Sequence, residues 1–128
     1  MAVQELRDGG RAVGTMIRMT RNPGIAWVAV QAGLDFIMLD LEHGPGSLET
    51  LADAAGIGRA AGVEVFVRVP ELAKGYVSRA LDCGCGGVMV PMIGSRQQAE
   101  LLAGWCKYAP DGKRGLGGVG THTNFAVV

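Results

Sequence analysis

The chain has 128 residues, of which 48% are apolar, and its formal net charge is zero. This composition is typical of one globular domain and argues against a disordered or fibrous chain. Nucleic-acid and membrane-surface partners both leave a basic excess, which is missing here, and no apolar run is long enough to cross a bilayer. Since the first residues, Met1 to Asp8, lack the apolar core of a signal peptide, we expect a cytoplasmic protein.

A short apolar run followed by a pattern of helical spacing occurs four times along the chain. The expected strands, in chain order, are Ala12–Ile17, Asp35–Leu41, Val63–Val69 and Gly87–Met92. The second is almost continuously apolar, which indicates burial on both faces.

The intervening segments carry helix start and stop signals. The candidate starts are Asn22-Pro23, Ser47 and Ser95, the last forming a capping-box pattern with Gln98. The third helix has Ala73, Val77, Ala80 and Leu81 at helical spacing, and the fourth has an apolar face of Leu101, Leu102, Trp105 and Cys106. The glycines expected to end the first three helices are Gly33, Gly62 and Gly84. The glycine-rich tail from Pro110 is left without an assigned element.

This alternation predicts an α/β fold of parallel βα repeats with right-handed crossovers. Two architectures fit: a doubly wound open sheet, or the first half, about four βα units, of a TIM (β/α)8 barrel. A complete barrel needs roughly 200 residues or more, so residues 1–128 would form a single partial-barrel domain. Such a half-barrel leaves two strand edges open, and these edges must be covered.

Polar side chains gather where two neighbouring strands end. Asp40, Glu42 and His43 follow the second expected strand, and Arg68 lies near the end of the third. The carboxyl ends of parallel strands are where ligands bind in barrels and in open sheets. We therefore expect one site that combines a titratable base, two carboxylates and a fixed cation.

The residues after the second strand allow more than one role. His43 is the natural general base or acid, since imidazole titrates near neutral pH, and the plainer alternative is a loop histidine with one backbone hydrogen bond. Its position in a loop beside charged residues favours function. Asp40 and Glu42 are two residues apart, so an extended backbone points both the same way. They could bind a metal, orient His43, or cap the turn at Gly44.

Arg68 and Asp82 also allow either a structural or a functional role. Arg68 lies in an apolar strand, where it could grip a substrate carboxylate or form an internal salt bridge, for example with Glu42 or Glu71. Asp82 lies near the C-terminal end of the third helix, where a carboxylate is slightly unfavourable against the helix dipole. That position indicates a role for the carboxylate other than contact with solvent.

Other residue patterns favour structural roles. Cys83, Cys85 and Cys106 fit neither a disulfide framework nor a zinc spacing, so we expect reduced thiols in or near the core. The glycines 115, 117, 118 and 120 resemble a phosphate loop, but no clear strand precedes them and no Lys-Ser/Thr pair follows. His122 is expected to be a loop residue, and Lys74 and Lys107 are expected to be solvated.

The segment from Asp35 to Pro45, Asp-Phe-Ile-Met-Leu-Asp-Leu-Glu-His-Gly-Pro, resembles the signature loop of the HpcH/HpaI aldolase/citrate lyase family. Further matching segments are Val67–Pro70, Arg79–Gly84, Gly87–Met92, Lys107-Tyr108 and Gly112–Gly115. They occur in order and at the family's spacing, and together they cover most of the chain.

The resemblance implies a class II, pyruvate-dependent aldolase that cleaves 4-hydroxy-2-oxo acids to pyruvate and an aldehyde, or runs the reverse addition. It implies that His43 is the catalytic base, that Arg68 binds substrate and stabilises the pyruvate enolate, and that Asp82 raises the basicity of the histidine across a subunit contact. Asp40 and Glu42 would line the substrate site. The implied partners are a 2-oxo acid and an aldehyde, bound by a homo-oligomer.

The resemblance also implies a divalent metal, Mg²⁺, Mn²⁺ or Co²⁺, held by a Glu and an Asp from later strands of the barrel. No residue of this chain matches either ligand, so the metal ligands are expected beyond Val128, where a fifth strand would begin. The alternative function is a non-catalytic half-barrel fragment that self-associates, two copies closing a ring of eight strands.

Overall fold

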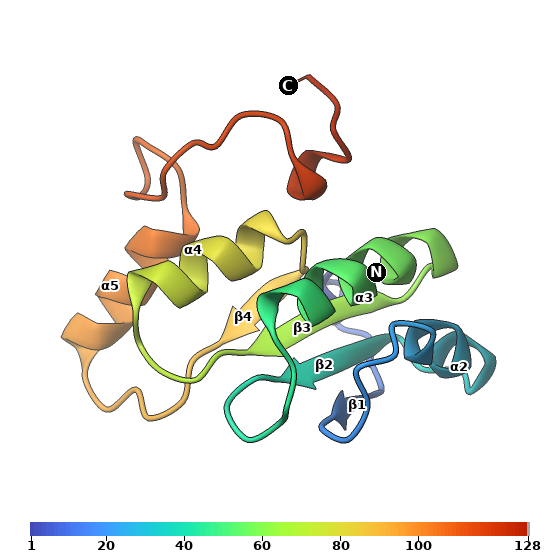
Figure 1. The fold of residues 1–128 in the computed structure, drawn as a ribbon. Helices are drawn as coiled ribbons and strands as arrows, with labels where there is room; N and C mark the ends of the chain where they lie inside the picture. Colours follow the sequence, from blue (N-terminus) through green and yellow to red (C-terminus); the bar gives the residue numbers. More distant parts are fainter. Residues whose placement is uncertain (128) are drawn as a thin grey trace.

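The computed structural model describes residues 1–127, and these form four βα units on one parallel sheet (Figure 1). The strands are β1 (Gly14–Ile17), β2 (Phe36–Asp40), β3 (Glu64–Arg68) and β4 (Gly87–Met89). The helices are α1 (Ala2–Arg7), α2 (Ile25–Gln31), α3 (Leu48–Ala61), α4 (Lys74–Asp82) and α5 (Arg96–Cys106), followed by a short 3₁₀ turn, η1 (Thr121–Thr123). The expected start of a fifth strand, Val128, lies outside the described residues.

The strands lie in the order β1-β2-β3-β4, each beside its neighbour in sequence. This confirms the predicted parallel α/β fold. A doubly wound sheet reverses its strand order at a switch point, whereas a barrel keeps sequential order throughout, so the topology is that of a barrel segment. Of the part of the chain that the structure describes, no helix is both long and apolar enough to cross a membrane.

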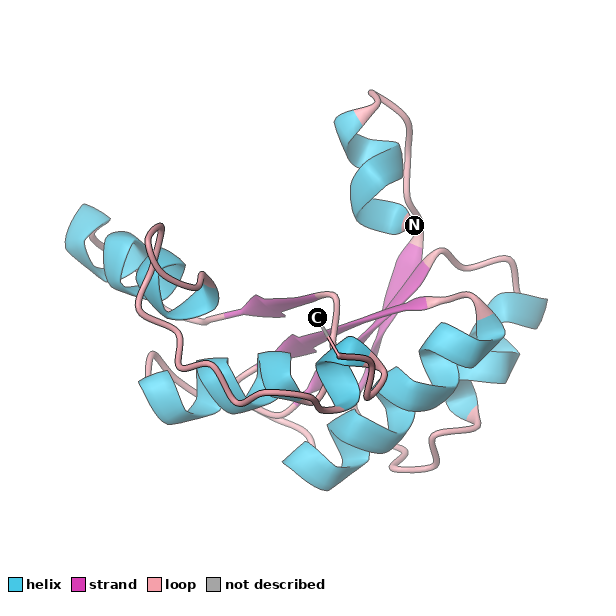
Figure 2. Ribbon diagram, turned by 90° about the horizontal axis from the view of Figure 1, so that it is seen from above, coloured by secondary structure: helices cyan, strands magenta, loops and turns pink. Residues whose placement is uncertain are grey.

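Helices α2, α3 and α4 cover one face of the sheet (Figure 2). Alternate strand residues point into this layer because successive side chains of a strand face opposite ways. Ile37 and Leu39 from β2 and Val65 and Val67 from β3 are buried there, packed with Leu51 of α3 and neighbouring small side chains. This layer is the hydrophobic core.

The other face carries rows of side chains in register across the strands. Met16, Met38 and Phe66 form one row, which ends at Gly87 on β4. The next row toward the strand starts contains Gly14, Phe36 and Glu64. Phe36 and Phe66 meet edge to face at 5.5 Å, and side chains on Gly14 or Gly87 would crowd these two rings. Such layers of inward-pointing side chains are how a barrel interior is filled.

Helix α1 was missed in the sequence because it is short and its amphipathic pattern is weak. Figure 2 shows it on the opposite side of the sheet from α2, α3 and α4. The backbone amide of Val3 donates to Oε2 of Glu64 at 3.2 Å, which ties α1 to the first residue of β3. Helix α1 therefore lies at the end of the sheet where the strands begin.

Most helix boundaries follow the expected signals. Gly33, Gly62 and Gly84 end their helices with positive φ, and Ser47 caps α3 through a reciprocal pair with Thr50. The first boundary was predicted too early, because Oδ1 of Asn22 accepts from the amide of Gly24 and forms a turn before α2 begins at Ile25.

The capping box at the start of α5 forms only in part. Oγ of Ser95 accepts from the Gln98 amide, but Gln98 turns its side-chain oxygen to the amide of Gly94 rather than that of Ser95. Strands β1 and β4 are also shorter than expected: β1 begins at Gly14, opposite the first residue of β2, and β4 ends at Met89, opposite the last residue of β3. The tail from Pro110 runs along the outside of α4, which η1 contacts (Figure 1).

We predict that Leu51→Ala lowers the free energy of unfolding by about 3 kcal/mol, because Leu51 is fully buried and its loss leaves a cavity in the core. The matched change Leu101→Ala, at a helical position that is 45% exposed, should cost less than about 1 kcal/mol. Urea unfolding followed by circular dichroism measures both, and equal losses would contradict this placement of the core.

Candidate active site

Asp40 ends β2, and its carboxylate is the centre of the polar cluster. Arg68 on β3 donates from Nε to Oδ1 at 3.0 Å and from Nη2 to Oδ2 at 2.7 Å. Nε of Arg18, just after β1, lies 3.1 Å from Oδ2. The side chain is shielded from solvent, so it is a buried charge paired with two cations.

The same carboxylate shapes the turn that carries the other predicted residues. The backbone amides of Glu42 and His43 both donate to Oδ1 of Asp40 at 3.1 Å. Gly44 completes the turn, where a side chain would collide with the carbonyl oxygen of Asp40. Asp40 therefore caps the turn, one of the roles expected from the sequence, and holds Glu42 and His43 beside the strand end.

The hydrogen bonds from Arg68 are the main reason that the pKa of Asp40 is lowered to about 2, and the backbone amides of His43 and Glu42 act in the same direction. Burial of the carboxylate acts against them and raises the pKa. The folded-state pKa thus lies below the ordinary value of 3.8. The ionised carboxylate stabilises the fold at pH values above 3.8, and this contribution is lost as the pH falls toward 2. The hydrogen bond to Asp40 in turn raises the pKa of Arg68 further above its usual range.

Arg68 forms the internal salt bridge that the sequence left open. Besides Asp40, it has Oε2 of Glu42 at 3.2 Å from its Nε, and the alternative partner Glu71 is exposed and takes no part. One fifth of its side chain remains exposed, and among residues 1–127 its Nη1 has no hydrogen-bond partner. A fixed guanidinium with a spare donor is suited to an oxyanion.

His43 projects from the turn with 57% of its side chain exposed. Its Nε2 lies 3.5 Å from Oε1 of Glu42, so the second carboxylate of the cluster contacts both His43 and Arg68. The structure thus brings Asp40, Glu42, His43 and Arg68 together, as predicted from their positions at the ends of two neighbouring strands.

Asp82 is not part of this cluster. It is the last residue of α4, at the end of the sheet where the strands begin, because α4 returns the chain from the end of β3 to the start of β4. Its Oδ1 accepts from Nη2 of Arg114 at 2.6 Å, and the Arg114 guanidinium stacks 4.7 Å from the centre of the Tyr108 ring. Contact with His43 requires a second copy of the chain, so that role stays a prediction.

Arg18 was not singled out in the sequence. Ile17 pairs with Leu39, so the next residue, Arg18, lies beside Asp40, which is itself paired with Arg68. The signal that could have found it is the one that found Arg68: a charged residue at the carboxyl end of an apolar strand.

The described residues do not fit a metal centre of their own. In residues 1–127 no group of three or more His, Cys, Asp and Glu side chains is placed to hold an ion. Both oxygens of Asp40 are bonded to arginines, and Glu42 is shared between Arg68 and His43.

The remaining candidates behave as structural residues. The three cysteines are free thiols, and burial raises the pKa of the Cys85 thiol to about 11, which makes it a poor nucleophile. Lys74 and Lys107 are exposed. His122 lies in η1, half-buried.

Comparison with known proteins places this arrangement in a family. The curated relatives include the 4-hydroxy-4-methyl-2-oxoglutarate aldolase of Hapsidospora irregularis, 37% identical over 80% of this chain and 38% of that protein. Another is the 4-hydroxy-2-oxovalerate aldolase of Novosphingobium aromaticivorans, 32% identical over 88% of this chain and 43% of that protein. The chain spans less than half the length of these relatives.

A solved structure gives the same result. The HpcH/HpaI aldolase from Desulfitobacterium hafniense DCB-2 superposes with a TM-score of 0.93 at 34% identity, covering 98% of this chain and 48% of that one. The four βα units therefore correspond to about half of a (β/α)8 barrel. Because residues 16–128 also match the family model, the chain belongs to the HpcH/HpaI aldolase/citrate lyase family.

Proposed function

We propose that this chain carries the base and the enolate-binding side of a class II aldolase that cleaves 4-hydroxy-2-oxo acids to pyruvate and an aldehyde, or catalyses the reverse addition. The observation that carries the proposal is the meeting of His43 and Arg68 at one strand end, held there by Asp40. The family includes aldolases that act on 4-hydroxy-2-oxo acids, which supports this reaction type.

The chemistry assigns a separate task to each side chain. His43 takes the proton from the C4 hydroxyl of the substrate, the C4 oxygen becomes the aldehyde carbonyl, and the electrons of the C3–C4 bond pass to the 2-oxo group as an enolate. Arg68 faces this enolate oxygen with its spare donor, where a preorganised cation lowers the barrier. Protonation of the enolate at C3 then gives pyruvate.

The proposal includes two contributions that residues 1–127 of a single copy do not supply. A divalent metal, Mg²⁺, Mn²⁺ or Co²⁺, would supply Lewis-acid stabilisation of the enolate, and it needs ligands from outside the described residues. Asp82 would act on His43 of a neighbouring copy, in a homo-oligomer. The free oxygen of Asp82 supports this role, because Arg114 bonds only Oδ1 and the side chain is 42% exposed.

The relatives do not indicate which chemical group lies beyond C4 of the substrate. One is an aldolase for 4-hydroxy-4-methyl-2-oxoglutarate, a dicarboxylate, and another for 4-hydroxy-2-oxovalerate, a monocarboxylate.

We predict metal-dependent release of pyruvate from a 4-hydroxy-2-oxo acid, measured with and without added Mn²⁺ by coupling to lactate dehydrogenase. His43→Ala should lower the rate by about 100-fold or more, since it removes the base. Arg68→Lys should lower it by about 100-fold, because a lysine loses the fixed fork of donors.

His122→Ala is the matched control, because it removes the other histidine of the chain. It should retain the wild-type rate, and circular dichroism should show that all variants are folded. No pyruvate from folded wild-type protein with metal would contradict the proposed activity.

A second candidate function, a half-barrel that works by self-association, is favoured by the inner face of the sheet. Met16 and Met89 on that face are 39% and 44% exposed, and β1 and β4 each pair on one side only within residues 1–127. Open strand edges and apolar surface favour pairing with another copy.

For this candidate we predict that the chain sediments as a dimer and that Met16→Glu weakens the dimer about tenfold or more, because it places a charge in the apolar row that Met16 forms with Met38 and Phe66. Met19→Glu, at a loop residue that is 97% exposed, should leave the dimer intact. Analytical ultracentrifugation across a concentration series measures both, and a monomeric wild type would rule this candidate out.

A further inference from the structure

Arg18 extends the charged row of the site onto a third strand. Met16 and Arg18 are two residues apart and face the same side of the sheet, as do Met38 and Asp40 on β2 and Phe66 and Arg68 on β3. The row at the strand ends thus reads Arg18, Asp40, Arg68, with a carboxylate between two guanidinium groups.

The two arginines differ in how many of their nitrogens are bonded and in how much of each side chain is exposed. Arg68 is bonded to both oxygens of Asp40 and lies 3.2 Å from Glu42, and only 21% of its side chain is exposed. Arg18 approaches Asp40 with its Nε at 3.1 Å from Oδ2, and 53% of its side chain is exposed. In the described part of the chain, the terminal nitrogens of Arg18 have no partner, so its fork of donors is open to a ligand.

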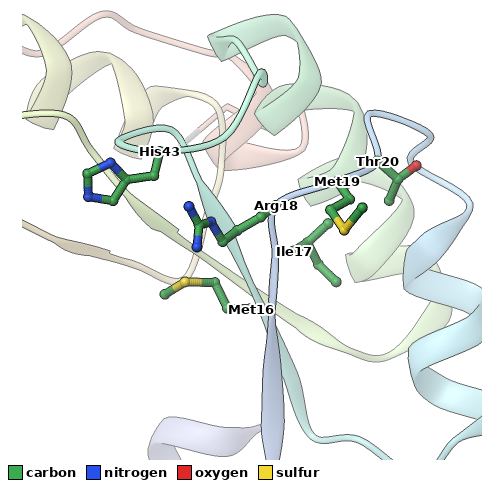
Figure 3. Close-up of a pocket in the computed structure, with 6 residues that line it drawn as sticks. All are labelled: Met16, Ile17, Arg18, Met19, Thr20 and His43. Atoms are coloured by element: carbon green, nitrogen blue, oxygen red, sulfur yellow. The ribbon is translucent and has the colours of Figure 1, made fainter.

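Those free donors border a cavity beside the base. A depression of about 550 Å³ is lined by Met16, Ile17, Arg18, Met19, Thr20 and His43. Figure 3 shows the guanidinium of Arg18 on the same side of β1 as His43 and Met16, whereas Ile17 and Met19 point to the other side. A molecule that reaches His43 in this depression therefore also meets Arg18.

The charge balance indicates what Arg18 can bind. The carboxylates of Asp40 and Glu42 offset two positive charges, but both contact Arg68 and only Asp40 contacts Arg18. An exposed, planar guanidinium with two terminal donors matches a carboxylate in bidentate geometry. If Arg18 served only to neutralise Asp40, its terminal nitrogens would have no use in the site.

We propose that Arg18 is a specificity-determining residue that binds a second carboxylate of the substrate, beyond the carbon whose hydroxyl His43 deprotonates. The chain would accordingly favour 4-hydroxy-2-oxo acids that are dicarboxylates over those that end in an uncharged group. This assignment rests on the proposed function for the placement of the reacting carbon at His43. The binding of a second carboxylate by Arg18 itself needs no turnover.

The test compares two non-reacting 2-oxo acids of equal chain length, 2-oxoglutarate and 2-oxopentanoate, which differ in the distal carboxylate. The dissociation constant of each ligand is measured by NMR titration of the full chain in buffer that contains Mg²⁺ and no Mn²⁺. The proteins compared are the wild type, Arg18→Gln and Arg18→Lys. The wild type should bind 2-oxoglutarate about tenfold more tightly, the effect of one charge-assisted bidentate pair. Arg18→Gln should abolish this preference without changing the affinity for 2-oxopentanoate, and Arg18→Lys should retain part of it.

Arg21→Gln is the matched control, because it removes an exposed arginine three residues away and should keep the preference. A wild type without preference, or a preference that survives in Arg18→Gln, would overturn the proposal. Equal loss of both ligands in Arg18→Gln would also overturn it, because Arg18 would then act only by holding Asp40. A preference that depends on Arg18 in a chain that releases no pyruvate would uphold the carboxylate site and reject the aldolase activity, so the two failures are distinguishable.

Discussion

The paired contact between Asp40 and Arg68 joins the ends of β2 and β3, and the rest of the site depends on it. A buried carboxylate is costly unless its lone pairs are used, and here they accept hydrogen bonds from Arg68 and two backbone amides, with Arg18 as a second cation 3.1 Å away. The same oxygen that accepts from Arg68 Nε also accepts from the amides of Glu42 and His43. The charge that fixes the arginine therefore also fixes the turn that presents the histidine.

This arrangement separates structural from chemical roles within one cluster. Asp40 is fully occupied and shielded, so it positions its neighbours and is not available to a substrate. Within residues 1–127 Nη1 of Arg68 has no hydrogen-bond partner, and His43 and Arg18 are both more than half exposed. Under the proposed function, the groups that react with or recognise a ligand form the outer layer and are held by an inner layer of paired charges, as preorganised sites require.

The fold and the cluster were largely predictable because both follow from local patterns. The apolar runs that became β2 and β3 locate the sheet, and parallel strands bring their ends together, so Asp40, Glu42, His43 and Arg68 had to meet at one edge. The internal salt bridge of Arg68 was one of two roles expected from the sequence, but its main partner, Asp40, was not among the partners named, and Glu42 is the second partner.

What the sequence could not supply depends on longer-range contacts. The docking of α1 depends on a bond between residues 3 and 64, and the pairing of Asp82 with Arg114 depends on the path of a glycine-rich loop without a periodic pattern. Arg18 was missed because it follows a strand of four residues, two of them exposed. The apolar pattern of such a strand is too weak to mark the residue at its carboxyl end as a candidate site residue. The family resemblance assigned roles to His43 and Asp82, but the distance between them within one chain emerges only from the topology.

The most direct test of this account is an NMR titration of the Asp40 side-chain carboxyl carbon, with the backbone amides of Glu42 and His43 followed in the same samples. The account predicts a pKa of about 2 for Asp40 in the folded chain, with both amides shifting at the same midpoint because they donate to that carboxylate. In Arg68→Gln the midpoint should rise toward the ordinary value of 3.8. A midpoint near 3.8 in the folded wild type, or amides that do not respond, would show that Asp40 does not hold the site together.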